Sequence, residues 1–153
     1  MAQRVRIISP NYYTEVKISA VALIKMVTHA VSGGKEEIMG VMQGKTMGSN
    51  FNSETFYVLD SFGLPVKGTE TRVNAGMEAQ IFQVQQLEMM QEIGKKEFLC
   101  GWYHSHPGYG CWLSGIDVTT QFYTQKIGAQ SIAIVIDPLK TMSTGIIEKE
   151  KWK

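Results

Sequence analysis

Residues Gly101 to Asp117 read GWYHSHPGYGCWLSGID and hold two of the chain's three histidines. A helix would point the side chains of His104 and His106 about 200° apart, because helical residues step by about 100° each. On a strand the two side chains face the same way, with Cα atoms roughly 6.6 Å apart, so both imidazoles can reach one ion at Zn–N distances of about 2.0 to 2.1 Å. A strand, placed at Phe98 to Ser105, would therefore allow the two histidines to share a metal.

The residues after the histidines predict a turn and then a helix. The loop Pro107 to Leu113 lets the chain turn back, and Gly108 and Gly110 permit backbone angles that other residues resist. Ser114 and Asp117 have the spacing of a helix capping box, which by itself indicates only a helix start. Beside His-x-His, a carboxylate in the first helical turn also suits an anionic metal ligand, because the helix dipole keeps it ionised. Cap and ligand both remain open as roles for Asp117.

Two neutral imidazoles and one carboxylate would make a three-ligand site with an open fourth position, which is typical of catalytic zinc. Zinc lowers the pKa of a water in that position towards roughly 7, and a nearby carboxylate that is not a ligand accepts the proton. Periodicity does not identify this carboxylate. An isolated His-x-His is usually an ordinary pair of histidines, and we interpret His29 in that way. The complete pattern carries the metal prediction.

The N-terminal half predicts one helix between strands. Val16 and Ile18 indicate a strand, and Ser19 caps a helix that ends at Gly33 and Gly34. The apolar residues of this helix are Leu23, Ile24, Val27 and Val31. The next strands are Glu37 to Lys45 and Thr55 to Ser61, joined by the turn-rich stretch Met47 to Ser53. These two strands are expected to form a hairpin.

The C-terminal half adds helices and strands in alternation. A helix is predicted from Ala75 to Ile93, with apolar residues at three-residue spacing: Ile81, Val84, Leu87, Met90 and Ile93. After the histidine strand come a helix at Ser114 to Gln125 and strands at Ser131 to Ile136 and Thr144 to Glu148. The order predicts an α/β (α+β) fold with helices packed on a sheet.

Composition restricts the class of protein. The chain has 153 residues, enough for one ordinary domain that buries roughly 70% of its unfolded surface. The formal net charge of +1 gives no basic field for nucleic acid, and no apolar run approaches the roughly 20 residues of a membrane span, so neither partner is expected. We predict a soluble intracellular protein. Cys100 and Cys111 are too few for a disulfide framework, and both are expected to be thiols.

His104-Ser105-His106-Pro107, followed by Ser114 and Asp117, resembles the motif of the JAMM (MPN-plus) metalloproteases. Within that family, the chain is similar to the catalytic deneddylating subunits of COP signalosomes, which remove a ubiquitin-like modifier from cullins. Other segments carry the same resemblance: ISAVALIKM (18–26), EIMGVMQGK (37–45) and DSFGLPVKGTETRVN (60–74).

This resemblance implies roles that the residue pattern alone does not supply. It assigns zinc, one ion per chain, to His104, His106 and Asp117, the acid/base function to Glu37, and an oxyanion hydrogen bond to Ser114. It also implies a mixed sheet flanked by helices, as in cytidine deaminases. Residues 1–153 would form a single catalytic domain without the family's C-terminal helical tail. The expected partners are a cullin conjugate and other signalosome subunits, especially an MPN-domain partner, and the expected location is cytoplasm and nucleus.

Several alternatives remain open. Glu70, near Arg72 in the loop Gly63 to Asn74, could reach the open zinc position and hold the enzyme inactive, but solvated loop charges are the favoured interpretation of both residues. The chain could instead be a proteasome-lid type of deubiquitinase, or a metal-free MPN scaffold module, because fold does not establish activity. A thiol protease using Cys111 is a further possibility.

Overall fold

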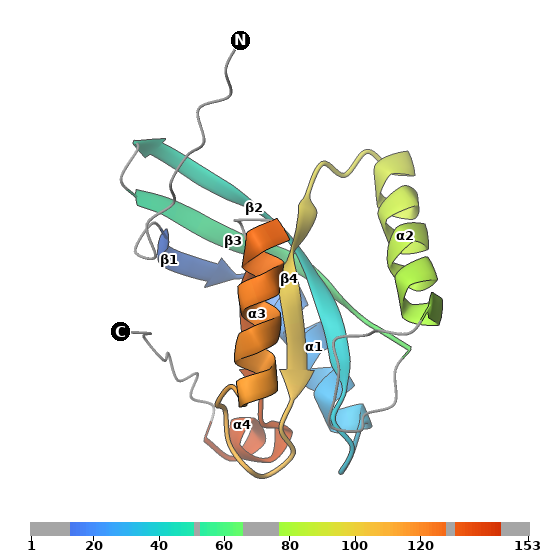
Figure 1. The fold of residues 1–153 in the computed structure, drawn as a ribbon, viewed down its shortest axis with the longest axis vertical. Coiled ribbons are helices and arrows are strands. Elements are labelled where there is room, and N and C mark those ends of the chain that lie inside the picture. The colour runs from blue at the N-terminus through green and yellow to red at the C-terminus, as the bar shows by residue number, and fades with distance from the viewer. Residues whose placement is uncertain (1–12, 51–52, 66–76, 128–130, 145–153) are drawn as a thin grey trace.

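The computed structural model describes residues 13–50, 53–65, 77–127 and 131–144 (Figure 1). Helices and strands alternate along these residues. In chain order they are β1 (Tyr13–Ile18), α1 (Ala20–Ser32), β2 (Met39–Asn50), β3 (Ser53–Gly63), α2 (Met77–Glu92), β4 (Phe98–Ser105), α3 (Gly115–Ile127), β5 (Ile132–Ile136) and α4 (Pro138–Thr144). Within the described ranges, none of the helices has the length and apolar character needed to cross a membrane.

The strands form one mixed five-stranded sheet in the order β1-β3-β2-β4-β5. The β1–β3 and β4–β5 pairs are parallel, and β2 pairs antiparallel with both β3 and β4. The sheet and its helices confirm the predicted α/β fold. Strand β4 is hydrogen-bonded on both sides, and its backbone passes very close to β5 at Gly101, where a Cβ atom would lie 1.9 Å from the Ile132 carbonyl oxygen.

Helix α1 covers one face of the sheet and builds the main core. Ser19 is its N-cap, as predicted, and accepts a hydrogen bond from the Ala22 backbone N–H (3.0 Å). The residues it buries are Ala22, Met26 and Ala30, whereas Ile24 is 64% exposed. The predicted apolar residues are therefore correct only in part: Val27 packs against the core, whereas Ile24 and Val31 are exposed. Two alanines on the inner side allow the helix to approach the sheet closely.

Helices α2 and α3 lie over the other face, with β4 running between α3 and α1 in Figure 1. From α2, Phe82 packs against Val41 and Leu64. The three-residue apolar spacing of α2 does not mark a buried stripe, since Ile81 and Val84 are both about half exposed. Helix α3 is tied to the sheet through Gln121, which accepts from the Trp102 indole N–H (3.0 Å) and donates to the Ser131 carbonyl (2.9 Å).

Two local predictions differ from the structure. Residues Met47 to Asn50 belong to β2 rather than to a turn, because pairing with β3 continues past a register shift as far as Asn50 and Ser53. Thr144 ends helix α4 instead of starting a strand, and residues 145–148 lie outside the described ranges. Asp137 and Pro138 start this short helix, since proline fits the first helical position.

Candidate metal centre

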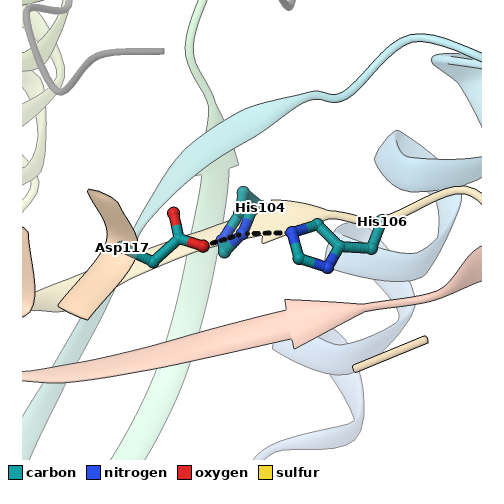
Figure 2. A group of neighbouring side chains, drawn as sticks. All are labelled: His104, His106 and Asp117. Atoms are coloured by element: carbon teal, nitrogen blue, oxygen red, sulfur yellow. Dashed lines mark hydrogen bonds and ion pairs between the residues drawn. The ribbon is translucent and has the colours of Figure 1, made fainter. Parts of the chain in front are cut away.

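Strand β4, which lies where the sequence predicts it, directs His104 and His106 to the same face of the sheet (Figure 2). His106 follows the strand directly, and its backbone N–H donates to the Ile136 carbonyl (2.8 Å), which holds it beside β5. The two Nε2 atoms are 3.0 Å apart, and both side chains are buried. The strand interpretation of the His-x-His spacing is therefore confirmed.

Asp117 reaches these histidines from the first turn of α3. Its Oδ2 atom lies 3.4 Å from His104 Nε2 (Figure 2). The same oxygen accepts from the Ser114 backbone N–H (2.7 Å), and Ser114 Oγ accepts from the Asp117 N–H (3.2 Å). These reciprocal bonds form a capping box, so the cap interpretation is confirmed. The cap also aims the carboxylate at His104, which makes the two roles of Asp117 compatible.

The geometry of this cluster fits a zinc ion. The candidate ligand atoms of His104, His106 and Asp117 all lie within 4.8 Å of one another. Tetrahedral zinc with bonds of about 2.0 to 2.1 Å separates its ligand atoms by roughly 3.3 Å. The observed separations of 3.0 and 3.4 Å lie on either side of that value. Displacements on the order of an ångström would bring all three atoms into ligand positions around one ion and leave the fourth position open.

Protonation favours metal binding as well. Burial lowers the pKa of His104 to about 4, more than offsetting the neighbouring Asp117 charge, so the imidazole is neutral at physiological pH. His106 Nδ1 lies 3.0 Å from the Gly110 carbonyl oxygen. A carbonyl only accepts, so Nδ1 carries the proton and Nε2 keeps the lone pair that a metal requires.

Glu37 lies on the same side of the sheet, two residues before β2 begins at Met39. Met39 pairs with His104, and Ile38 exchanges hydrogen bonds with Ser105, so the next position places Glu37 opposite His106. The Tyr109 hydroxyl donates to the half-buried Glu37 carboxylate. The structure therefore brings together the three predicted ligands and the predicted acid/base residue.

Comparison with known proteins agrees with this geometry. A family model described as JAB1/Mov34/MPN/PAD-1 ubiquitin protease matches residues 11–130, which is most of the chain. The chain belongs to this family. Its JAB1/MPN fold thus agrees with the family resemblance predicted from the histidine motif.

Curated relatives of this JAB1/MPN chain include signalosome subunits. It is 54% identical over 139 residues to COP9 signalosome complex subunit 5 of Dictyostelium discoideum, covering 91% of this chain and 40% of the relative. Identity to subunit 5a of Arabidopsis thaliana is 55% over 139 residues, covering 91% and 38%. For subunit 5 of Drosophila melanogaster it is 52% over 136 residues, covering 89% and 40%. The chain spans about two fifths of the length of these relatives.

Asp137 is a residue of this JAB1/MPN domain that the sequence interpretation missed. Its carboxylate, fully buried, accepts from four backbone N–H groups: Gly108 (3.1 Å), Gly110 (2.9 Å), Leu139 (3.0 Å) and Lys140 (3.2 Å). Burial opposes ionisation, but these donors together hold the pKa of Asp137 below its ordinary value. The sequence did contain a signal for this residue: Asp137 stands between the apolar strand that ends at Ile136 and Pro138, the position of a helix N-cap.

Tyr109 was also missed, because its role depends on contacts between distant segments. Its ring stacks on His106, with centroids 4.6 Å apart and planes at 26°. Trp112 closes the same loop: its indole N–H donates to the Tyr109 carbonyl (3.0 Å) and its ring meets the edge of His106. The loop between the histidines and α3 is thus an ordered part of the JAB1/MPN site.

The remaining candidates lie elsewhere. His29 packs beside Gly63 on the α1 face, and its Nδ1 is 2.9 Å from the Tyr103 hydroxyl, so it is an ordinary packing residue as predicted. Cys100 is buried and Cys111 exposed, and neither forms a disulfide. Glu70 and Arg72 lie outside the described residues, so their proposed regulatory role stays a prediction.

Proposed function

We propose that this chain is the catalytic domain of a zinc-dependent isopeptidase that removes a ubiquitin-like modifier from cullin lysines. The observation that carries the proposal is the convergence of His104, His106 and Asp117, with their ligand atoms within 4.8 Å and Glu37 on the same face. The names of the relatives support membership of a signalosome. The partners would be the modified cullin and other signalosome subunits, especially an MPN-domain partner, in cytoplasm and nucleus.

His104, His106 and Asp117 would hold the zinc. When bound, zinc supplies Lewis acidity, which polarises a carbonyl and makes water nucleophilic near neutral pH. Glu37 accepts the proton of the attacking water and delivers it to the departing lysine amine. The Ser114 oxygen accepts from the Asp117 N–H, so its own O–H can donate to the developing oxyanion. Such a donor contributes roughly 3 to 4 kcal/mol in comparable sites.

The substrate is proposed to bind in extended form. A C-terminal modifier tail that adds as a strand along a sheet edge would gain main-chain hydrogen bonds, and it would present the scissile carbonyl to the site. No covalent enzyme intermediate is needed, because water rather than a side chain attacks.

Substitution of the base tests the mechanism. We expect Glu37→Gln to retain one zinc per chain but to lose at least about 100-fold in turnover of a cullin–modifier conjugate, because the amide cannot accept the proton. The matched control is Glu36→Gln, since Glu36 is the exposed neighbour. Metal content and cleavage would be measured on the same preparations. Unchanged turnover of Glu37→Gln would reject the acid/base assignment.

Substitution of a ligand tests the metal centre. His104→Ala and His106→Ala should each remove the zinc along with activity, because two remaining ligands bind it far more weakly. If the unmodified protein bound no zinc, the chain would instead be a metal-free scaffold module.

A ubiquitin-specific activity is the second candidate, because the family description names a ubiquitin protease. Ubiquitin and cullin–modifier conjugates would be compared at equal concentration in one assay. A higher kcat/KM for the ubiquitin conjugate would favour a proteasome-lid type of deubiquitinase over the proposed specificity.

A further inference from the structure

Tyr109 contacts both halves of the candidate site. Its ring stacks on the proposed ligand His106, with centroids 4.6 Å apart, and its hydroxyl donates to Oε1 of the proposed base Glu37. The side chain is 44% exposed, so burial alone does not explain where it lies. These contacts join the loop after β4 to the segment before β2, which are 72 residues apart in sequence.

The backbone around Tyr109 is held on both sides. Gly108 and Gly110 have positive φ angles of 90° and 93°, and their N–H groups donate to the Asp137 carboxylate. The Tyr109 carbonyl accepts from the Trp112 indole N–H (3.0 Å). The restrained backbone fixes the Cα–Cβ direction of Tyr109, and stacking of the ring on His106 then places its hydroxyl at Glu37.

Glu37 needs a restraint of this kind. It precedes the first residue of β2, and its side chain has several rotatable bonds. A general base must keep within hydrogen-bond reach of the proton it accepts, and small displacements of a reacting group cost rate. The bond from Tyr109 fixes Oε1 and thereby also sets the direction of Oε2.

We propose that Tyr109 is a positioning residue that orients the Glu37 carboxylate for proton transfer. The ring and the hydroxyl have separate effects. The hydroxyl acts on Glu37 and therefore on turnover, whereas the ring packs on His106 and therefore acts on metal affinity. This inference rests on the proposed function, because it presupposes that Glu37 is the base.

Tyr109→Phe tests the hydroxyl because it keeps the ring. In the assembled protein with zinc bound, kcat for the conjugate should fall roughly 10- to 100-fold, while KM, zinc affinity and Tm stay unchanged. Tyr109→Leu removes the ring as well and should also weaken zinc affinity, by roughly tenfold, in a metal titration that needs no turnover. Tyr123→Phe is the control, because Tyr123 is an exposed tyrosine on α3, and all four quantities should match those of the unmodified protein.

The outcomes separate this inference from the function on which it rests. Full turnover by Tyr109→Phe together with an inactive Glu37→Gln would overturn the role of Tyr109 and leave the proposed function standing. A parallel loss of zinc affinity in Tyr109→Phe would also overturn it, because the hydroxyl would then act through the metal site. An active Glu37→Gln would overturn the acid/base assignment of Glu37 and with it the role of Tyr109, whereas loss of zinc binding and of cleavage in the unmodified protein would overturn the proposed function.

Discussion

Asp137 shows how one carboxylate can order a functional loop. It accepts two N–H groups from the loop that carries Tyr109 and two from the first turn of α4. Gly110, one of the loop donors, also offers its carbonyl to His106 Nδ1 (3.0 Å). The orientation of a proposed ligand therefore depends on a residue that does not itself join the metal cluster.

Replacement of Asp137 should reduce both stability and metal affinity. Asn at this position turns one acceptor into a donor that faces a buried N–H, so we expect Asp137→Asn to lower the free energy of unfolding by about 2 to 3 kcal/mol. Zinc affinity should fall as well, because the carbonyl that orients His106 would move. Urea unfolding and metal titration would measure the two effects. Glu92→Gln, at an exposed position, should change neither.

The low pKa of Asp137 gives this contribution a pH dependence. The folded state holds the pKa below the ordinary value of 3.8, so the unfolded state takes up the proton first as pH falls. The stability due to this carboxylate is fully present above about pH 3.8 and is lost as pH falls towards the lower folded value. The stability difference between the unmodified protein and Asp137→Asn, followed by unfolding at several pH values, should therefore narrow below about pH 4. A constant difference would contradict this account.

At the scale of elements, the position of the site depends on the close approach of β4 to β5. Gly101 has a φ of 139°, and a Cβ atom there would lie 1.9 Å from the Ile132 carbonyl oxygen. His104 follows Gly101 by only three positions. Any displacement that relieves the clash therefore moves the strand that carries both imidazoles.

Gly101→Ala should consequently destabilise the protein by about 3 kcal/mol or more, from backbone strain together with overpacking. Gly115→Ala is the matched control, because no atom lies within 4 Å of an added Cβ there, and it should change stability by less than about 1 kcal/mol. Thermal unfolding of both variants would check the difference. Equal stability of the two variants would mean that β4 and β5 can separate without cost.

For the whole molecule, a bound metal would join β4 to α3, two elements that are separated by a loop. The sequence predicts one domain over residues 1–153, so thermal unfolding should be a single transition. Bound zinc should raise the Tm of that transition. With free zinc at 100 times its Kd, the added stability should be about 2.7 kcal/mol, and a chelator should remove it. Calorimetry with and without chelator measures this, and His106→Ala should not respond. A chelator effect that persists in His106→Ala would place the stabilising metal elsewhere.

The sequence predicted the parts of the molecule that follow from local pattern. Strand Phe98–Ser105 and the Ser19 cap were correct, since alternation and capping act over a few residues. The buried face of α1 was predicted only in part: Val27 packs against the core, but the burial of Ala22 depends on the sheet beneath the helix, which the helix sequence does not show. Tyr109 acts across 72 residues, a separation that neither periodicity nor spacing encodes. The metal ligands could be proposed because they lie within one short segment.

Strand β4 uses its two faces for different purposes, which restricts how its length can vary. Tyr103 is buried on the α1 face, while its neighbour His104 points to the opposite face. Because side chains alternate with a period of two, deletion or insertion of a single residue inside the strand would turn both imidazoles into the hydrophobic core and bring the tyrosine out. Changes in length are therefore expected to be tolerated in the segment before Phe98, where they leave this alternation intact.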